Sequence, residues 1–267
     1  ALMEHDVTVQ AILTAAAEEF IRPLTFAALT NQKVITELFA SRSADEVLAS
    51  SVEHIRVAQE TDVLVIAPAT ADLLAKLAAG LAGDFLTTLY LAFRGPVILA
   101  PAMNTNMWEH PATRANIETL AARGCHIVEP DSGPLACGTV GAGRLPDPHR
   151  IADAVLTIAC TRKDLEGETV LITAGPTQES IDPVRFISNR SSGKMGYALA
   201  SAAASRGARA ILVSGPVNLP DPYGVELLRV RSALEMRDAV MSHLDPATII
   251  IKSAAVADYH VANPSPQ

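Results

Sequence analysis

The sequence predicts an α/β protein with two doubly wound, Rossmann-like parallel-sheet domains. The first observation is a set of short apolar runs, at 63–67 and 97–100, that are apolar on both faces, as strands buried in a parallel sheet are. The second is the leucine-rich helical pattern that follows the first run, at 73–77. The third is a polar stretch that separates two such regions. We therefore expect a first domain at 1–160, a linker at 161–168 and a second domain at 169–267.

Composition and charge exclude several function classes. The 267 residues contain no apolar run near the roughly 20 residues that span a bilayer, so we expect no membrane partner. A formal net charge of −8 argues against nucleic acid as a partner. The three cysteines, Cys125, Cys137 and Cys160, have neither disulfide nor metal-ligand spacing. We expect a cytoplasmic protein that binds small molecules or other subunits, with Cys125 and Cys160 buried in its core.

The first residues predict a helix end at 1–6 and a strand at 7–12, so we expect that a first strand is missing in front of them. Helical spacing of apolar residues follows, around Phe20, Leu24 and Leu29. Thr14 lies at the predicted strand end. Its hydroxyl can contact a ligand phosphate there, or it can cap the next helix.

A helix start is predicted near His54. Ser50 and Glu53 have the spacing of a capping box, which places His54 in the first turn. A helix N-terminus disfavours a cationic imidazole, so the ring should be neutral and able to accept a proton. The alternative is an ordinary surface histidine.

Two strand ends supply further candidates. The strand at 63–67 leads into Pro68, Ala69 and Thr70, where Thr70 can cap the next helix or help its neighbouring amides to hold a phosphate. The strand at 97–100 leads into Asn104, which should emerge at the strand's carboxyl end, where open α/β sheets bind ligands. An asparagine in a tight turn is the alternative.

A glycine-rich flap is predicted between 131 and 144. Gly138, Gly141 and Gly143 let the backbone turn sharply or approach a ligand closely, and Cys137 lies among them. The glycine order differs from the Rossmann fingerprint. We interpret the segment as a mobile flap that carries a thiol, with a plain surface loop as the alternative.

The second domain should begin with a strand at 169–173, after a helix at 151–160. A helix from Lys194 to 206–207 and a strand at 210–213 complete a βα unit of nucleotide-binding type. The stretch at 186–196 is not a Walker A motif, because Met195 stands where a Ser or Thr must hold magnesium. It can bind an anion through backbone amides, or it is a plain capped loop. Two further strands should end on the same sheet edge, at 213–216 and 253–259.

Four segments carry a resemblance to a known family. The segments at 52–55, 67–71, 101–107 and 133–144 are similar in order and spacing to the flavin-dependent cysteine decarboxylases of coenzyme A biosynthesis. This resemblance implies a flavodoxin-like first domain that binds FMN and converts 4'-phosphopantothenoylcysteine into 4'-phosphopantetheine. Two features depart from the family: its first strand with the flavin-phosphate loop is absent, and Leu145 follows Arg144 where Met is commoner.

The resemblance also implies residue roles and a trimer, because family members hold the flavin between subunits. His54 would act as the base, Asn104 would hold the substrate carboxylate and the flavin, and Cys137 would protonate the enethiolate. The implied cofactor-binding residues are Thr14, Pro68, Ala69, Thr70 and Met103, and the implied substrate-binding residues are Met107, Ala136, Gly138, Gly143 and Arg144.

Residues 169–259 resemble the N-terminal part of the phosphopantothenate-cysteine ligases, which many bacteria fuse to the decarboxylase. The resemblance implies a dimer that joins 4'-phosphopantothenate and cysteine with CTP and Mg²⁺. Asn189 would then hydrogen-bond the acyl-phosphate intermediate. Gly175 and Ser214 would line the nucleotide site, and Asp258 would contact the nucleotide or the metal. The family's lysine-rich loop does not appear before Gln267, so we expect both termini to be incomplete.

Two rival functions stay open. The first half alone fits a peptidyl-cysteine decarboxylase, but the ligase-like second half argues against that function. Relatives of this fold also serve as flavin-binding regulatory subunits, and the presence of both His54 and Cys137 argues against a regulatory role.

Overall fold

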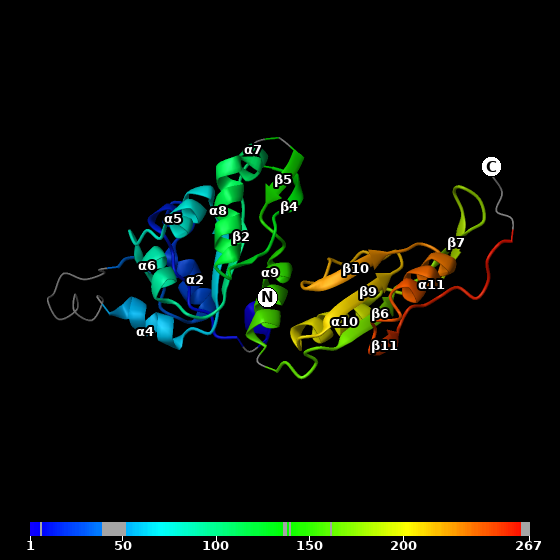
Figure 1. Cartoon of the computed structure of the whole chain (residues 1–267). Coiled ribbons are helices and arrows are strands. Elements are labelled where there is room, and N and C mark those ends of the chain that lie inside the picture. Colours follow the sequence, from blue (N-terminus) through cyan, green and yellow to red (C-terminus); the bar gives the residue numbers. More distant parts are fainter. Residues whose placement is uncertain (6, 39–51, 136–137, 139, 161, 263–267) are drawn as a thin grey trace. The chain divides into compact units, whose positions relative to one another are not determined.

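The computed structural model describes residues 1–5, 7–38, 52–135, 138, 140–160 and 162–262 (Figure 1). Its contacts divide the chain into two compact units, residues 1–155 and 156–267, which we describe separately. The division falls inside helix α9 (Pro148–Ala159), and the linker expected at 161–168 stays a prediction. Within the described ranges, no helix is long and apolar enough to cross a bilayer.

Unit 1 is built on a parallel sheet with the strand order β1-β2-β3. Its strands are β1 (Leu64–Ala69), β2 (Val97–Pro101) and β3 (His126–Ile127). The strands expected at 63–67 and 97–100 are therefore confirmed. Every residue of β2 is buried, as its uninterrupted apolar sequence requires.

Helix α5 (Ala71–Ala79) closes one part of the unit 1 core. Leu74 and Leu77 are fully buried and belong to the same apolar cluster as Ile66 of β1. Burial of a leucine side chain stabilises a fold by roughly 1.5–3 kcal/mol, so this face fixes the helix on the sheet. The helix that the leucine spacing predicted is confirmed.

Further helices of unit 1 lie between residues 53 and 122. They are α4 (Glu53–Glu60), α6 (Phe85–Ala92), α7 (Thr105–Glu109) and α8 (Pro111–Ala122). Helix α4 packs against α6, and α5 packs against α8. Helix α6 was not predicted, although the capping box of Asp84 and Thr87 marks its start.

Two expectations for the first twelve residues are corrected. The helix end expected at 1–6 is a single 3₁₀ turn, η1 (Leu2–His5). The strand expected at 7–12 is wrong, because only Ile12 pairs, through an isolated bridge to Ile35. An apolar run becomes a strand only where a neighbour supplies a continuous ladder of hydrogen bonds.

The helical pattern around Phe20 forms two short helices, α1 (Ala15–Glu18) and α2 (Pro23–Thr30). Pro23 begins the second helix, a position where the missing amide hydrogen costs nothing. Phe20 and Leu24 are 92% and 77% exposed, so the apolar spacing predicted helix but not a buried face.

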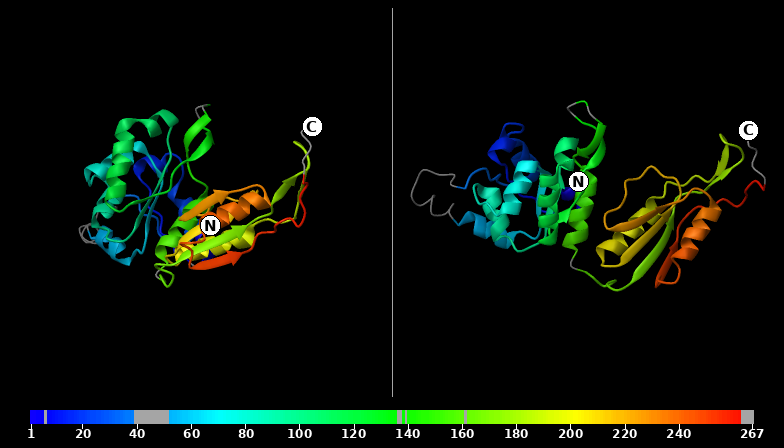
Figure 2. Two further views of the ribbon diagram at one scale, coloured as in Figure 1. Left: turned by 45° about the vertical axis from the view of Figure 1, so that its right-hand side comes forward. Right: turned by 45° about the horizontal axis from the view of Figure 1, so that its top comes forward.

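Unit 2 contains a four-stranded parallel sheet with the order β10-β9-β6-β11. The strands are β6 (Thr169–Ala174), β9 (Arg209–Ser214), β10 (Val225–Arg229) and β11 (Ile249–Lys252) (Figure 2). The chain moves outward from β6 to β10 and then returns to place β11 on the other side of β6. Such a reversal is the switch point at which doubly wound sheets bind ligands.

Two helices cover the unit 2 sheet, α10 (Lys194–Ser205) and α11 (Ala233–Ser242). Val170 and Ile172 of β6 pack in one cluster with Tyr197 of α10. Leu171, between them in the sequence, packs in another cluster with Met236 of α11. Alternate residues of a strand face opposite sides, so the sheet is covered on both faces, as the doubly wound prediction requires. The helix expected at 194–206 and the strands at 169–173 and 210–213 are confirmed.

A hairpin that the sequence analysis did not anticipate follows β6, with strands β7 (Gln178–Ser180) and β8 (Phe186–Ser188). Asp182 closes its turn by accepting hydrogen bonds from the amides of Val184 and Arg185, at 2.9 and 2.7 Å. These backbone bonds and the Arg185 guanidinium lower the pKa of the Asp182 carboxyl.

The cysteine expectations are only half correct. Cys125 is buried, but Cys160 is only partly buried, and its thiol donates to the Arg162 carbonyl at 3.6 Å.

Helix α9 begins at Pro148, three residues before the expected start. Asp147 explains this, because its carboxylate accepts from the amide of His149 at 2.8 Å.

Candidate functional site

The carboxyl ends of β1 and β2 form one edge of the unit 1 sheet. Ala69 is the register partner of Pro101, and the amide of Ala102 donates to the Ala69 carbonyl at 3.2 Å. Thr70 directly follows β1, and Asn104 lies in the loop after β2. The expected place of Asn104 is therefore confirmed, and the structure brings it to the same edge as Thr70.

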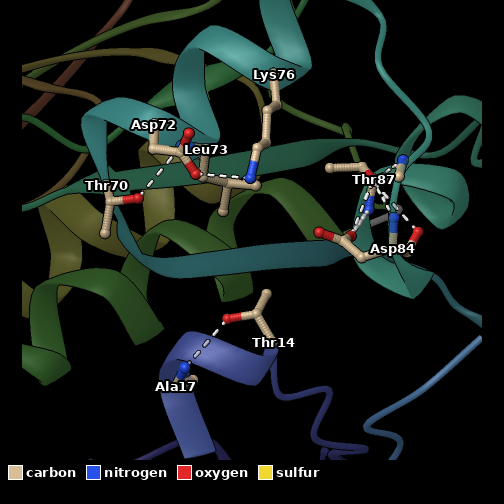
Figure 3. Close-up of polar contacts among 9 residues, drawn as sticks. Thr14, Ala17, Thr70, Asp72, Leu73, Lys76, Asp84 and Thr87 are labelled. Carbon is tan, nitrogen blue, oxygen red and sulfur yellow. Dashed lines mark hydrogen bonds and ion pairs between the residues drawn. The ribbon is translucent and has the colours of Figure 1, made fainter. Parts of the chain in front are cut away.

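Thr70 and Thr14 both cap helices. The Thr70 hydroxyl accepts from the amide of Leu73 at 3.3 Å at the start of α5, and the Thr14 hydroxyl accepts from Ala17 at 3.3 Å at the start of α1 (Figure 3). Thr14 also lines a cavity of about 200 Å³ together with Glu37 and Asp84. Two carboxyl groups there disfavour a phosphate, so the structure supports capping for Thr14, and its contact with a cofactor stays a prediction.

Asn104 begins helix α7. Its Oδ1 accepts from the amide of Asn106 at 2.9 Å, so the side chain is an N-cap. Met107 on this helix is 49% exposed, whereas the neighbouring Trp108 is buried. Met103 packs partly against the apolar core. The structure thus leaves Met107 accessible to a substrate, as its predicted role requires.

The flap is an antiparallel hairpin, β4 (Asp131–Pro134) and β5 (Val140–Arg144), that lies on the Asn104 loop. The amide of Met103 donates to the carbonyl of Gly143 at 2.9 Å. A Cβ on Gly143 would lie 2.2 Å from the Met103 oxygen, and a Cβ on Gly141 would lie 2.6 Å from the Thr105 hydroxyl. These two glycines therefore let the flap approach the chain's own loop.

The tip of the flap is described only in part. Gly138 has a positive φ of 82° and open space around it. Arg144 ends β5 and is exposed. Ala136 and Cys137 lie outside the described residues, so their predicted roles stay predictions.

The capping-box prediction before His54 is wrong. Helix α4 begins at Glu53 with Val52 as the N-cap, whereas a capping box would need Glu53 in the third helical position; Ser50 itself lies outside the described residues. The Glu53 carboxylate instead lies 3.4 Å from the Lys33 ammonium group. His54 still lies in the first turn, as expected.

Among the described residues of unit 1, the buried side-chain atoms without a hydrogen-bond partner are Nδ1 of His54 and Oγ1 of Thr105. An unsatisfied buried polar group costs about 1–3 kcal/mol, so such atoms commonly await a ligand. His54 was a sequence candidate, whereas Thr105 was missed, although it directly follows Asn104. The Thr105 hydroxyl therefore fits a bound group that supplies a hydrogen-bonding atom at this edge.

The loops at the carboxyl edge of the unit 2 sheet are hydrogen-bonded to one another. The amide of Gly215 donates to the Ala174 carbonyl at 2.9 Å, and the amide of Ala255 donates to the Gly175 carbonyl at 2.8 Å. A Cβ on Gly215 would lie 1.7 Å from the Pro176 oxygen. The expectation that the ends of β9 and β11 share one edge is confirmed.

Gly175 lies beside the start of α10. It has a φ of 75°, and its Cα would lie 3.5 Å from a Cβ on Gly193, the N-cap of α10. No side chain caps this 12-residue helix, so its first amides have no side-chain acceptor at the N-cap. The predicted nucleotide position of Gly175 therefore lies next to a helix N-terminus of the kind that binds phosphate.

Ser214 and Asn189 both form hydrogen bonds within unit 2. The Ser214 hydroxyl is buried, accepts from the Tyr197 hydroxyl at 3.2 Å and donates to the Gly215 carbonyl at 2.8 Å. The Asn189 amide nitrogen donates to the carbonyls of Ala255 and Val256, at 3.3 and 2.9 Å. Asn189 thereby holds the loop before α10 against the segment after β11. The functional roles predicted for both residues stay predictions.

Asp258 follows β11 and is exposed. Across the part of the chain that the structure describes, no group of three or more His, Cys, Asp or Glu side chains is placed to hold a metal ion. The metal role predicted for Asp258 stays a prediction.

Comparisons with known proteins agree with the two-part organisation of the sequence. The chain matches the family described as Flavoprotein over residues 1–159. It matches the family described as DNA/pantothenate metabolism flavoprotein C-terminal domain over residues 165–267.

Curated relatives match almost the whole chain. The coenzyme A biosynthesis bifunctional protein CoaBC of Bacillus subtilis (strain 168) is 48% identical over 261 residues, which are 97% of this chain and 63% of the relative. The CoaBC protein of Escherichia coli (strain K12) is 45% identical over 266 residues, which are 100% of this chain and 64% of the relative. The chain thus spans less than two thirds of the length of these relatives.

Two solved structures are similar to separate parts of the chain. A PPC decarboxylase mutant complexed with pantothenoylaminoethenethiol is 32% identical with a TM-score of 0.48, covering 56% of this chain and 81% of that chain. The C-terminal domain of a CoaBC protein is 52% identical with a TM-score of 0.37, covering 38% of this chain and 52% of that chain. Because the Flavoprotein match covers more than half of its residues, the chain belongs to the flavoprotein family.

Proposed function

We propose that residues 1–159 form an FMN-dependent decarboxylase of coenzyme A biosynthesis, which converts 4'-phosphopantothenoylcysteine into 4'-phosphopantetheine. The observation that carries this proposal is the docking of the glycine flap on the loop that holds Asn104, through Met103 and Gly143. Membership of the flavoprotein family and the names of the CoaBC relatives support it.

The cofactor-binding residues would be those at the carboxyl edge of β1 and β2. The N-terminus of α5, with Thr70 as its cap, suits a phosphate. Pro68 and Ala69 directly precede it, and Met103 follows β2. The unpartnered hydroxyl of Thr105 offers a hydrogen bond to a bound group. When bound, FMN would supply the two-electron oxidation of the thiol-bearing carbon, which lets the electrons left by carbon dioxide delocalise onto sulfur.

The protein residues would bind the substrate and move its protons. His54 would accept a proton at its unpartnered Nδ1, helped by its place in the first turn of α4. Asn104 would hold the substrate carboxylate, and Met107 would contact the rest of the substrate. The flap, with Gly138, Gly143 and Arg144, would exclude water. Cys137 would protonate the enethiolate carbon, because a thiol is acidic enough for that step.

For the second unit we propose the preceding reaction, CTP-dependent ligation of 4'-phosphopantothenate with cysteine. Activation is needed because a carboxylate is a poor electrophile, and Asn189 would hydrogen-bond the acyl-phosphate intermediate. Gly175 and Ser214 would line the nucleotide site, with Asp258 toward the nucleotide. Mg²⁺ usually binds through substrate phosphates and few carboxylates, so it would arrive with CTP. Decarboxylase trimers, ligase dimers and a cytoplasmic location complete the proposal.

Separate assays test the two activities on the full-length protein. Freshly purified protein should show a flavin absorption band and should release carbon dioxide from 4'-phosphopantothenoylcysteine, with 4'-phosphopantetheine identified by mass. A colourless protein that also fails to bind added FMN would rule out the decarboxylase proposal. Ligation should require CTP, and ligation that proceeds without any nucleotide would rule out the ligase proposal.

A further inference from the structure

Unit 1 contains a second cavity, of about 310 Å³, at the opposite end of its sheet from Thr70 and Asn104. Val97, the first residue of β2, lines it, as does Cys125, the residue before β3. The cavity therefore lies at the amino ends of these strands. Nothing in the proposed decarboxylase mechanism uses it.

The charged side chains that line this cavity are two arginines, Arg94 and Arg123, and no lining residue is acidic. The chain as a whole has a formal net charge of −8. Within the described residues, neither guanidinium group forms a salt bridge, although several other arginines do. The cavity is thus a local concentration of uncompensated positive charge.

The other polar groups in the cavity are neutral. The Tyr90 hydroxyl lies 3.7 Å from the Cys125 thiol. Burial raises the pKa of Tyr90 to about 12, and burial also raises the pKa of Cys125, so both groups keep their protons near pH 7. They add no negative charge to offset the arginines. Arg123 is also held in place, because its guanidinium donates to the Leu77 carbonyl at 3.4 Å.

The rest of the cavity wall is apolar, with Leu91, Phe93 and Val97. Its volume is at the lower end of the range for small-molecule sites and exceeds that of a bare inorganic ion. We propose that this cavity binds a small organic oxyanion, a phosphate monoester or a carboxylate on an apolar body, with Arg94 and Arg123 contacting the anion. Tyr90 would donate a further hydrogen bond.

Binding of model anions to the 267-residue chain tests the proposal. Phenyl phosphate and benzoate carry the two anion types on the same ring, and phenol is the neutral control. Calorimetric titration at low ionic strength should show saturable binding of at least one anion and none of phenol. The relative affinity of phenyl phosphate and benzoate then identifies the preferred anion.

Single variants locate the bound anion. Arg94 is exposed and makes no described contact, so Arg94→Gln should preserve the fold and weaken binding about tenfold or more. Arg123→Gln should do the same, and Tyr90→Phe should weaken binding severalfold. Arg22→Gln removes the same charge from an exposed position at the start of α2 and should have no effect.

Two results would overturn the proposal. One is the absence of saturable binding of either anion up to about 10 mM, a concentration that would detect even millimolar affinity. The other is binding that Arg94→Gln and Arg22→Gln weaken equally, because a general charge effect would then explain it. Binding that responds to Thr70→Ala and not to Arg94→Gln would place the anion at the carboxyl edge and would also contradict the proposal.

Discussion

The amide of Met103 donates a hydrogen bond to the carbonyl of Gly143 at 2.9 Å, and this bond joins the flap to the loop that carries Asn104. Gly143 has a φ of 134°, and a Cβ there would lie 2.2 Å from the Met103 oxygen. The position of the flap therefore requires glycine at residue 143, because any side chain there would break the contact with Met103.

Gly143→Ala should separate the flap from the Asn104 loop. Both the φ and the overlap with Met103 oppose an alanine, so decarboxylation should fall by more than about tenfold, with a loss of stability on the order of 1–3 kcal/mol. Gly80→Ala is the matched control, because residue 80 also has a positive φ but has open space around it and lies outside the flap. Steady-state kinetics and thermal unfolding of both variants measure the effect. Equal activity in the two variants would show that the contact is unimportant.

His54→Asn should block the first proton transfer. The amide cannot accept a proton as an imidazole does, so 4'-phosphopantothenoylcysteine added without oxygen should leave the flavin absorption band of the full-length protein unchanged. His149→Asn, also in the first turn of a helix, is the control and should react like the parent. Rapid mixing followed at the flavin band measures both. If His54→Asn bleaches the band at the parental rate, His54 is not the base.

Asn189→Asp should impair ligation and leave the flavin content normal. The change removes the amide that donates to Ala255 and Val256 and places a negative charge beside an anionic intermediate. Loss of a charge-assisted hydrogen bond costs about 1.5–3 kcal/mol, so the rate of ligation should fall roughly tenfold or more. Asn218→Asp adds the same charge to an exposed position in unit 2. CTP-dependent ligation by Asn189→Asp at the parental rate would refute the assignment.

Asp164→Asn should change the acid sensitivity of unit 2. Hydrogen bonds from Arg206, at 2.7 and 2.8 Å, and from Arg162 lower the pKa of the Asp164 carboxyl to about 2. A lowered pKa in the folded state contributes stability above the unfolded value, and this contribution is lost as the pH falls from about 4 to 2. The variant should therefore have a lower melting temperature than the parent at pH 7, and this difference in melting temperature should shrink toward pH 2.

Thermal unfolding from pH 7 to pH 2 measures this difference. For Arg206→Gln, the difference in melting temperature from the parent should also shrink toward pH 2. The double variant should lose less stability than the sum of the losses in the two single variants. A difference between parent and Asp164→Asn that is constant with pH would mean that the ion pair does not contribute to stability.

Much of the fold could be predicted from local patterns. Strands β2, β6 and β9 are buried on both faces, so their uninterrupted apolar runs identify them. The same kind of run identified β1, although its Ala67 and Pro68 are exposed. Helix α6 was missed although its signal, Asp84 and Thr87 at capping-box spacing, is visible in the sequence. The prediction of a strand at 7–12 was wrong for a different reason. A strand needs a hydrogen-bonding partner strand, and the local sequence pattern does not show whether one is present.

The site could be predicted less completely. The place of Asn104 follows from the end of an apolar strand, so the sequence predicted it correctly. The bond between Ser214 and Tyr197 joins a strand end to a helix 17 residues earlier, and no spacing rule indicates it. The glycines of the flap were expected to admit a ligand, whereas Gly141 and Gly143 approach Thr105 and Met103.

The hydrogen bonds among the loops of unit 2 also bear on how the sheet opens. The amides of Gly215, Ala255 and Thr177 each donate to a carbonyl of a neighbouring loop. Because each loop is hydrogen-bonded to the next, no loop can unfold locally without breaking a bond to its neighbour. The loops at the carboxyl edge should therefore unfold together, as a single cooperative unit. Hydrogen–deuterium exchange of these amides should therefore be slow and uniform, with protection close to that of the β6 interior.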